Sequence, residues 1–333
     1  MRVLITGCAG LIGSALCRWL PSSIDVVGVD DLSGGFLDNV PSNVVFVQAN
    51  LTNPDDQKRI ATFFPFDYVF HCAAYAAEGL SPFIRQYNYT NNTVATAFLV
   101  SESIRHGVKR FIFTSSMAVY GAQKVPFDET FRPEPVDPYG IAKYACELDI
   151  KVAHEQHGLS YCIIRPHNVY GPGQNIWDPY RNVLGIWMLQ ILEGKPPTLY
   201  GDGKQTRAFS YVDDLVPCLW RAAVDPLAHC QTINVGGIQS IELNDALDIV
   251  IEVTGAPKNK VHLEARHEVR HAWSTHKKSI EILGYSESVS LRQGLERMWS
   301  WVLKQPPRAQ KFWSEYELDT GIYSFWKLKK SDA

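Results

Sequence analysis

The segment DPYGIAKYACELD holds Tyr139 and Lys143 four residues apart, a spacing that puts a phenol and an ammonium on one face of a helix. A free tyrosine side chain has a pKa of about 10, so its hydroxyl is a weak base at neutral pH. A nearby positive charge favours the phenolate and lowers that pKa. Ser116, or alternatively Thr114 or Ser115, ends the apolar run before this helix and can hydrogen-bond a reacting oxygen. These residues form a candidate proton-transfer group for chemistry at an alcohol carbon.

The glycine-rich segment near the beginning of the sequence is a candidate dinucleotide site. Gly7, Gly10 and Gly13 follow an apolar strand and open a helix, the context that the dinucleotide-binding fingerprint requires. The first glycine of that fingerprint permits a tight turn, the second lets the backbone approach a pyrophosphate, and the third lets the helix pack on the strand. Asp30, followed by Asp31, can accept hydrogen bonds from the adenosine ribose and would repel a 2′-phosphate. The pattern therefore favours NAD over NADP.

The elements that must position these groups alternate along the first half of the chain. Short runs rich in Val, Ile, Phe or Tyr and bounded by turn residues are predicted strands, at 2–6, 25–30, 44–48, 68–71, 110–114 and 160–165. Predicted helices lie between them, at 12–20, 55–63, 91–106 and 139–157. This alternation predicts an α/β fold with a doubly wound (Rossmann) parallel sheet, which binds ligands at the carboxyl ends of its strands.

After about residue 167 the alternation stops, and a loop rich in Pro, Gly and Asn follows. We expect residues 1–166 to form an NAD-binding domain, to which a segment near 211–236 returns. We expect 167–210 and 237–333 to form a smaller C-terminal substrate-binding lobe and an aromatic tail. The tail from Gln305 is expected to pack on its own protein or on a sister subunit rather than on a ligand.

Composition and charge exclude several classes of function. Hydrophobic residues make up 46% of the 333 residues and charged residues 20%, which is ordinary for a globular protein. The net charge is −3 and no long basic run occurs, so a nucleic-acid surface is not expected. Seven cysteines without CxxC or Cys/His spacing favour reduced thiols in a cytoplasmic protein and no metal site. No signal peptide and no apolar run long enough for a membrane span are visible.

These motifs together resemble the extended short-chain dehydrogenase/reductase family, and within it the NAD-dependent nucleotide-sugar epimerases and dehydratases. The matching segments lie between residue 4 and about residue 214. They are TGCAGLIG, VDDL, HCAA, YTNNTVAT, FTSSMAVYG, PYGIAKYACE, RPHNVYGPG and GDGKQTRAFSYVDD. The resemblance implies 4-epimerisation of a substrate of the UDP-glucose/UDP-galactose type, with UDP-N-acetylglucosamine or a UDP-uronic acid as further candidates. It also implies a homodimer that pairs through the helices near 91–106 and 139–157.

The resemblance assigns roles to individual residues. Ser116 and Tyr139 would touch the sugar hydroxyl, and Lys143 would hold the nicotinamide ribose. The substrate diphosphate would meet the amide of Asn168 and the guanidinium of Arg207, groups that suit phosphate oxygens. The glycine turn, the acidic pair Asp30 and Asp31, and the pair Tyr139 and Lys143 would all contact the cofactor. Further cofactor contacts would come from Leu11, Ile12, Asn50, Leu51, Ala73, Ala74, Asn92 and Pro166.

The residues after Ser116 separate the possible reactions. In the related 4,6-dehydratases this position carries an acid and a base for water elimination, whereas this chain has Met117 and Ala118, which cannot move protons. No second acid–base pair is visible in the sequence, which favours oxidation and re-reduction at one carbon. Two alternatives remain. One is a dehydrogenase or reductase of the same family that releases NADH, and the other is a non-catalytic cofactor-sensing protein.

The nucleotide end of the substrate site matches the family less well. Arg266 and Glu268 resemble the family's uridine-binding motif with the arginine displaced by one position. Alignment on Glu268 puts Ala272 where a bulky tyrosine excludes N-acetylated sugars in some relatives, so we expect a pocket that admits larger sugars. Arg181 is a further candidate partner for a substrate carboxylate.

Overall fold

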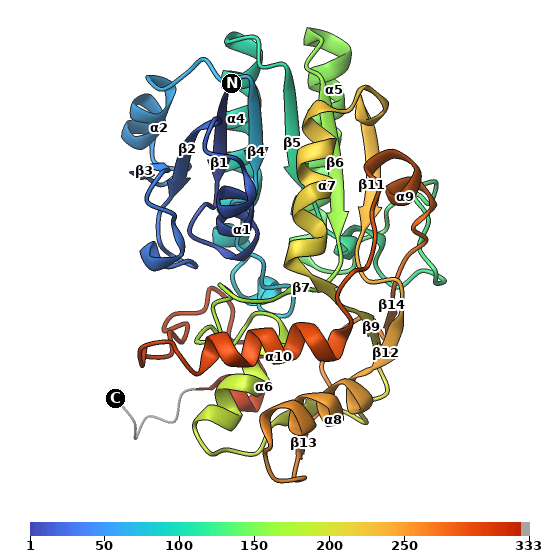
Figure 1. The fold of residues 1–333 in the computed structure, drawn as a ribbon. Helices are drawn as coiled ribbons and strands as arrows, with labels where there is room; N and C mark the ends of the chain where they lie inside the picture. Colours follow the sequence, from blue (N-terminus) through green and yellow to red (C-terminus); the bar gives the residue numbers. More distant parts are fainter. Residues whose placement is uncertain (328–333) are drawn as a thin grey trace.

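A seven-stranded, fully parallel sheet forms one half of the computed structural model, which describes residues 1–327 (Figure 1). The strand order is β11-β6-β5-β4-β1-β2-β3. This arrangement confirms the predicted doubly wound α/β fold, since the chain winds outward in both directions from the centre of the sheet. The strands are β1 (Arg2–Thr6), β2 (Asp25–Asp30), β3 (Val45–Gln48), β4 (Tyr68–His71), β5 (Arg110–Thr114), β6 (Tyr161–Pro166) and β11 (Gln231–Val235).

Helices cover both faces of the sheet, which explains why its strands are apolar on both sides. One face packs against α1 (Leu11–Trp19), α7 (Val212–Val224) and α9 (Lys277–Leu283). The other face packs against α2 (Pro54–Ala61), α4 (Ala95–Arg105) and α5 (Pro138–His157). Two hydrophobic cores result, one on each side of the sheet, and they hold its carboxyl edge in place.

The strand order reverses between β1 and β4. β1 pairs with β2 on one side and with β4 on the other. The chain leaves β1 at Gly7 and leaves β4 at Cys72 and Ala73, so these segments meet at the carboxyl edge. A crevice opens at such a switch point because successive connections leave in opposite directions.

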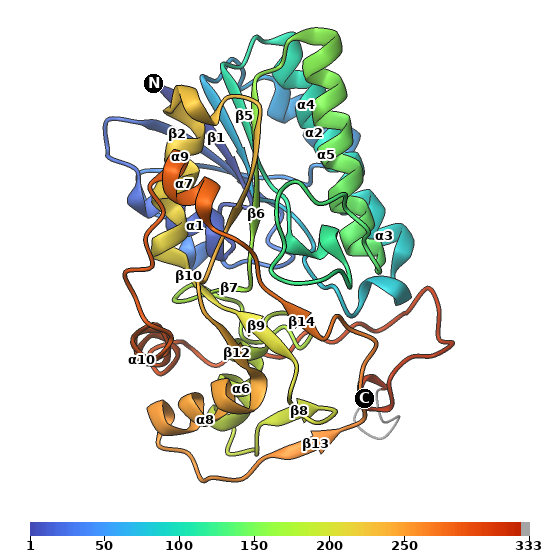
Figure 2. The ribbon, with the colours of Figure 1, turned by 90° about the vertical axis from the view of Figure 1, so that its right-hand side faces the viewer.

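The second half of the molecule lies beyond this carboxyl edge (Figure 2). Its elements are short, and three small sheets join them: β10 pairs with β7, β9 lies between β12 and β14, and β13 pairs with β8. They are β7 (Val169–Tyr170), α6 (Val183–Leu192), β8 (Thr198–Tyr200), β9 (Thr206–Ala208), β10 (Ser210–Tyr211), β12 (Ser240–Glu242), α8 (Leu243–Thr254), β13 (Val261–Leu263), β14 (His271–Ala272) and α10 (Leu291–Val302). We call this half the lobe.

Two segments differ from the sequence prediction. α9 falls in the stretch expected to belong to the lobe, but Leu283 and the following Tyr285 pack with α7 in the core beneath the sheet. The helix expected at 91–106 consists of α3 (Arg85–Tyr89), a π-helical turn at Thr90–Val94, and α4. The turn is not visible in the apolar pattern because the helical chain continues through it.

The tail after α10 contacts both halves of the molecule. Its aromatic residues form a cluster with Tyr75, Phe83 and Tyr180. The carboxylate of Glu317 accepts hydrogen bonds from the backbone N–H groups of Gln86 (2.7 Å) and Tyr87 (2.8 Å) at the start of α3. In the lobe, the hydroxyl of Tyr323 accepts a hydrogen bond from the His267 backbone (2.9 Å). The tail therefore packs on its own protein, as expected.

The described residues also bear on the cysteines and on membrane insertion. All seven cysteines are free thiols. Within residues 1–327 no helix combines the length and apolar character that a membrane crossing requires.

Candidate active site

A cavity of about 780 Å³ lies between the carboxyl edge of the sheet and the lobe. It gathers side chains from almost the whole length of the chain, from the first glycine to the aromatic tail. All predicted cofactor and substrate residues line it except Asn92. Those that do are Gly7, Gly10, Leu11, Ile12, Gly13, Asp30, Asp31, Asn50, Leu51, Ala73, Ala74, Ser116, Tyr139, Lys143, Pro166, Asn168, Arg207, Arg266 and Glu268.

The glycine turn is built so tightly that side chains are excluded. Gly7 has a φ of +70°, and an added Cβ would lie 2.7 Å from the backbone nitrogen of Ala73. A Cβ on Gly13 would lie 2.2 Å from the Gly7 carbonyl oxygen. No side chain caps the amino end of α1, so its first N–H groups face the cavity uncapped. A diphosphate fits this position because backbone donors and the helix dipole both favour an anion.

Asp30 lies beside the glycine turn, at the end of β2. Its carboxylate accepts hydrogen bonds from the backbone N–H groups of Ala9 (3.0 Å) and Leu32 (2.8 Å). These bonds fix the orientation of the carboxylate and leave lone pairs for the hydroxyl groups of a ribose. Burial raises the pKa of Asp30, while the two backbone bonds act in the opposite direction. Asp31 lies beside it in the cavity wall and adds negative charge against a 2′-phosphate.

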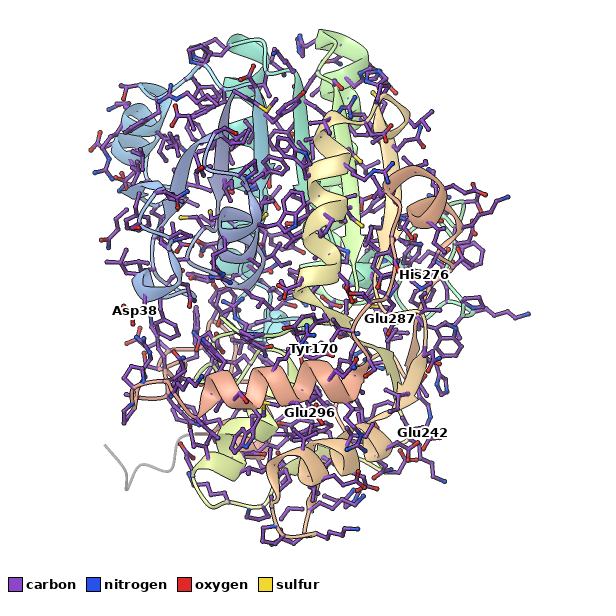
Figure 3. All side chains as sticks on the ribbon, in the orientation of Figure 1. Asp38, Tyr170, Glu242, His276, Glu287 and Glu296 are labelled. Atoms are coloured by element: carbon purple, nitrogen blue, oxygen red, sulfur yellow. The ribbon has the colours of Figure 1, made fainter. Side chains whose placement is uncertain are left out.

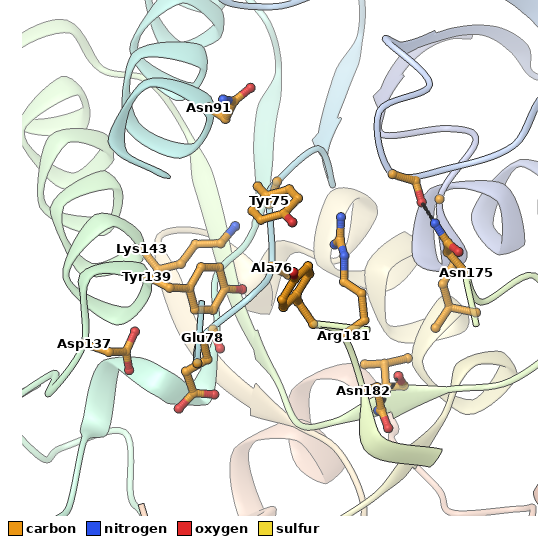
Figure 4. A pocket seen from close by; sticks show the side chains of 18 of the residues that line it. Tyr75, Ala76, Glu78, Asn91, Asp137, Tyr139, Lys143, Asn175, Arg181 and Asn182 are labelled. Atoms are coloured by element: carbon orange, nitrogen blue, oxygen red, sulfur yellow. Dashed lines mark hydrogen bonds between the residues drawn. The ribbon is translucent and has the colours of Figure 1, made fainter. Parts of the chain in front are cut away.

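Asn92 does not line the cavity, contrary to the sequence prediction. Its side-chain oxygen accepts a hydrogen bond from the Tyr75 backbone (3.0 Å), and its nitrogen donates to the Tyr75 carbonyl (3.3 Å) and to Asn88 (2.9 Å). The neighbouring Asn91 faces the cavity instead (Figure 4). The π-helical turn at this point shifts the helical phase, which a regular helix pattern does not reveal. Asn92 thus supports the loop after β4.

Tyr139 and Lys143 point from α5 into the cavity (Figure 4). The helix begins at Pro138 and is capped by Asp137, which accepts from the Gly140 N–H (2.9 Å), so the phenol stands in its first turn. The ammonium of Lys143 donates to the Thr114 carbonyl (2.7 Å). It lies 5.9 Å from the centre of the Tyr139 ring. The two groups share one face of the helix, as their spacing predicts.

The pKa of Tyr139 is shifted in the opposite direction to the sequence expectation. Burial raises the pKa of this hydroxyl, and a hydrogen bond from Ser116 only partly offsets the rise. Lys143 does not reverse this rise, and burial lowers the pKa of its own ammonium to about 8. Desolvation thus outweighs the local charge of the protein. A positively charged ligand in the cavity would lower the pKa of Tyr139 and so favour the phenolate.

Of the three hydroxyl residues considered, only Ser116 is available to a ligand. Thr114 donates to the His71 carbonyl (2.9 Å), and Ser115 donates to Glu147 (2.6 Å). Glu147 is in turn bonded to Arg165 beneath the site. The Ser116 hydroxyl accepts from the Ala118 N–H (3.1 Å), lines the cavity and lies beside the Tyr139 hydroxyl, whose pKa its hydrogen bond lowers. The geometry therefore favours Ser116 as the partner of a reacting oxygen.

The predicted substrate residues meet on the lobe side of the cavity. Arg207 on β9 forms an ion pair with Glu268 (3.1 Å), and Arg266 approaches the same carboxylate oxygen (3.5 Å). Arg266 also stacks on the Tyr200 ring, 3.9 Å from its centre. The amide nitrogen of Asn168 donates to the Ala208 carbonyl (3.1 Å), which leaves its second N–H free. Two guanidinium groups share one carboxylate, so the cluster carries excess positive charge suited to a diphosphate.

Two acidic residues in the cavity were missed by the sequence analysis, which found no second acid–base pair. Glu78 follows β4, and Asp137 precedes α5; both stand near Tyr139 (Figure 4). Burial raises the pKa of Glu78 to about 7 and that of Asp137 to about 6. Neither belongs to a recognisable motif. The sequence Asp137-Pro138 is typical of a helix start and could have identified Asp137 as a helix cap. No local pattern predicts Glu78, because only the fold brings it into the cavity.

Two expectations about the sugar pocket are not supported by the geometry. Ala272 does not line the cavity; it is packed among Met117, Tyr120 and Phe127. The pairing of β14 with β9 turns its side chain into this cluster. Arg181 does line the cavity, but its charge is paired with Asp178 (2.9 Å).

The tail, expected to avoid ligands, contributes Thr320, Gly321 and Tyr323 to the cavity wall.

The residues present fit a dinucleotide and give no sign of a metal. The turn around Gly7 is a cradle that a single Cβ would fill, and the carboxylate of Asp30 faces it. In the described part of the chain, no group of three or more His, Cys, Asp or Glu side chains could hold a metal ion.

The fold and the cavity define a dinucleotide-dependent α/β enzyme with a tyrosine–lysine pair at the carboxyl edge of its sheet. The chain belongs to the NAD dependent epimerase/dehydratase family, whose model matches residues 3–236. This confirms the resemblance seen in the sequence motifs. The cofactor of this family is NAD, as Asp30 and Asp31 at the end of β2 predict.

Named relatives extend the likeness beyond the matched domain. A UDP-glucose 4-epimerase of Mycolicibacterium smegmatis is 32% identical over 308 residues, which cover 89% of this chain and 97% of the relative. The structure of a Thermotoga maritima UDP-glucose 4-epimerase with UDP-glucose superposes with a TM-score of 0.86 at 33% identity, over 91% of this chain and 99% of that one. The structure of a Bacillus cereus UDP-glucuronic acid 4-epimerase with UDP-glucuronic acid and NAD superposes with a TM-score of 0.83 at 30% identity, over 91% of this chain and 99% of that one.

Proposed function

We propose that the protein is an NAD-dependent nucleotide-sugar 4-epimerase that interconverts UDP-glucose and UDP-galactose. The observation that carries the proposal is that one cavity gathers a group for each part of this reaction. The glycine turn and Asp30 come from the carboxyl edge of the sheet, Ser116 and Tyr139 from the segment after β5 and the start of α5, and Arg207 from β9 of the lobe. A sugar whose diphosphate meets Arg207 has its far side at Tyr139, where the reacting hydroxyl belongs.

Each residue has a defined task in this reaction. The residues around the glycine turn and Asp30 would hold NAD, which would supply the hydride acceptor and donor for carbon 4. Tyr139 takes the proton of the C4 hydroxyl and gives it back, and Ser116 hydrogen-bonds the same oxygen as it becomes a carbonyl. Lys143 holds positive charge beside the phenolate. The 4-keto sugar turns over between the two transfers, so no reduced cofactor accumulates.

Chemistry at a second carbon has less support. Met117 and Ala118, which follow Ser116, are buried and do not line the cavity. Of Glu78 and Asp137, the two cavity carboxyl groups near Tyr139, Asp137 is bonded to the amino end of α5. A mass measurement of the products separates the cases, since elimination of water lowers the mass and epimerisation does not.

The proposal is tested with the purified protein and a panel of nucleotide sugars. UDP-glucose, UDP-galactose, UDP-N-acetylglucosamine and UDP-glucuronic acid are incubated separately, and the products are resolved by configuration at carbon 4. We expect interconversion of the hexoses without net NADH absorbance. A stoichiometric rise in NADH would instead indicate a dehydrogenase, and no turnover with bound NAD would indicate a cofactor-sensing protein.

We further propose a homodimer that pairs through α4 and α5. Apolar side chains are exposed on α5, at Ile141, Leu148 and Val152, and in the π-helical turn before α4, at Val94; each is between 42% and 50% exposed. Exposed apolar side chains that line up along two packed helices are typical of subunit contacts. Light scattering in solution measures the mass and tests this directly.

A further inference from the structure

Glu78 is an acidic residue of the cavity that neither takes part in the proposed reaction nor, unlike Asp137, caps a helix. It stands in the loop after β4, and Figure 4 shows its side chain close to Tyr139 and on the same side as Asp137. The loop is held in place from behind by Asn92, through the Tyr75 backbone. The position of Glu78 in the cavity wall is therefore part of the fold.

Several other charged side chains of the cavity have partners of their own. Arg207 and Arg266 share Glu268, and Arg181 is paired with Asp178. Among residues 1–327, no donor within hydrogen-bonding or ion-pair distance is found for the Glu78 carboxylate. The Glu78 side chain is exposed at the cavity wall, so its carboxylate is free to accept a hydrogen bond from a ligand.

The place of Glu78 between the two ends of the site indicates which part of a ligand it meets. Its charge acts on Tyr139 at the reacting end and is itself acted on by Arg207 at the diphosphate end. If the proposed function holds, the hexose ring spans the distance between these two residues. A carboxylate in that interval faces the sugar rather than the nucleotide.

We propose that Glu78 determines the sugar specificity of this site: it accepts a hydrogen bond from a hydroxyl group of a neutral hexose and disfavours a sugar that carries a carboxylate. Two like charges that approach in a partly desolvated pocket repel each other, which lowers affinity for a uronic acid. Arg181 does not cancel this effect, because Asp178 already neutralises it and its guanidinium stacks on Tyr75 (4.8 Å). The proposal narrows the substrate class of the function proposed above.

The repulsion should depend on pH. Asp137 and Tyr139 face Glu78 from α5, Arg207 faces it from β9, and Glu268 and Arg266 face it from the segment before β14. Burial, with Asp137 next in size, raises the pKa of Glu78 to about 7. The carboxylate form, and with it the rejection of uronic acids, is therefore lost as the pH falls through about 7.

The test compares the NAD-loaded wild-type protein with Glu78→Gln, which keeps the shape and removes the charge. Dissociation constants for UDP, UDP-glucose and UDP-glucuronic acid are measured by calorimetry, together with kcat/KM for both sugars. We expect the preference for UDP-glucose over UDP-glucuronic acid to fall about tenfold or more in Glu78→Gln, while the affinity for UDP stays the same. The wild-type preference should also weaken at acidic pH, and the variant should lose this dependence.

Glu296→Gln on α10 is the matched control, because Glu296 is exposed and outside the cavity (Figure 3). NAD content and melting temperature show whether Glu78→Gln folds. An unchanged preference between the two sugars overturns the proposal even if epimerisation is confirmed. An equal shift for all three ligands also overturns it, since Glu78 would then act on the diphosphate. A changed binding preference without any epimerisation supports the role of Glu78 and refutes the proposed function.

Discussion

The two walls of the cavity are built in different ways. The cofactor wall is made largely of backbone: Gly7 and Gly13 leave no room for a methyl group, and the Asp30 carboxylate is fixed by two backbone N–H groups. The substrate wall is made of long side chains from distant segments, such as Arg207, Glu268 and Arg266, which hold one another through ion pairs. The cofactor wall is therefore specific for one ligand shape, whereas substitution of a single side chain in the substrate wall can change which ligand binds there.

Tyr139 belongs to both walls, and its removal should have the largest effect. Tyr139→Phe deletes the hydroxyl that carries the proton but keeps the ring, so epimerisation should fall by about 10²–10⁴-fold. NAD content and melting temperature should stay close to wild type, since the hydroxyl holds no element together. Product analysis after long incubation measures the loss. Residual activity within about tenfold of wild type would contradict the assigned role.

The cofactor wall should break after the addition of one methyl group. In Gly7→Ala the new Cβ meets the Ala73 backbone at 2.7 Å, and the residue must keep a φ of +70°. We expect loss of bound NAD and a drop of about 2–4 kcal/mol in the free energy of unfolding, from strain and overpacking together. Gly107→Ala is the matched control, with a φ of +63° and no atom near the added Cβ. It should cost about 1–2 kcal/mol and retain NAD; equal NAD loss in both variants would refute the argument.

A substitution in the substrate wall should weaken substrate binding without abolishing it. Arg207→Lys keeps the charge but loses the fork that can bind Glu268 and a diphosphate together. We expect the Kd for UDP to rise about tenfold, with NAD content unchanged. Calorimetry with UDP and absorbance of released NAD measure the two effects separately. Loss of NAD in this variant would show that the two walls are not independent.

The rate of epimerisation should also depend on the charge of Lys143, because Lys143 acts on Tyr139, which belongs to both walls. Burial lowers the pKa of this ammonium to about 8, so it is charged below that pH and becomes neutral above it. We expect kcat/KM for UDP-glucose to decline above pH about 8, by up to tenfold per pH unit. Circular dichroism at each pH excludes unfolding as the cause. A profile that stays flat well above the Lys143 pKa contradicts the prediction.

A change outside both walls should leave the chemistry of a subunit nearly intact. Leu148→Asp places a charge on the exposed apolar surface of α5, where Leu148 is 46% exposed. If α4 and α5 pair between subunits, the variant should be a monomer by light scattering, while bound NAD is retained. Leu227→Asp, at a site 66% exposed, is the control and should not change the mass. A wild-type monomer would refute the dimer.

The same difference between the walls explains what could be predicted from the sequence. The parallel sheet, the glycine turn, Asp30 and the Tyr139–Lys143 pair depend on short-range spacing, and the structure brings them together as expected. Asn92 was misplaced because a π-helical turn altered the phase of an otherwise regular helix. Glu78 and the tail residue Tyr323 were missed because only the fold brings them into the cavity. The raised pKa of Tyr139 depends on burial, which no local motif reveals.

The contacts of the tail have a mechanical consequence. Glu317 ties it to the nucleotide-binding half at α3, and Tyr323 ties it to the lobe at His267. The tail therefore links the two halves, and Thr320, Gly321 and Tyr323 of the tail form part of the cavity wall. If the proposed epimerisation holds, the sugar must rotate between two hydride transfers, which needs free volume and also a barrier to escape. A link of this kind would oppose separation of the two halves without filling the space between them.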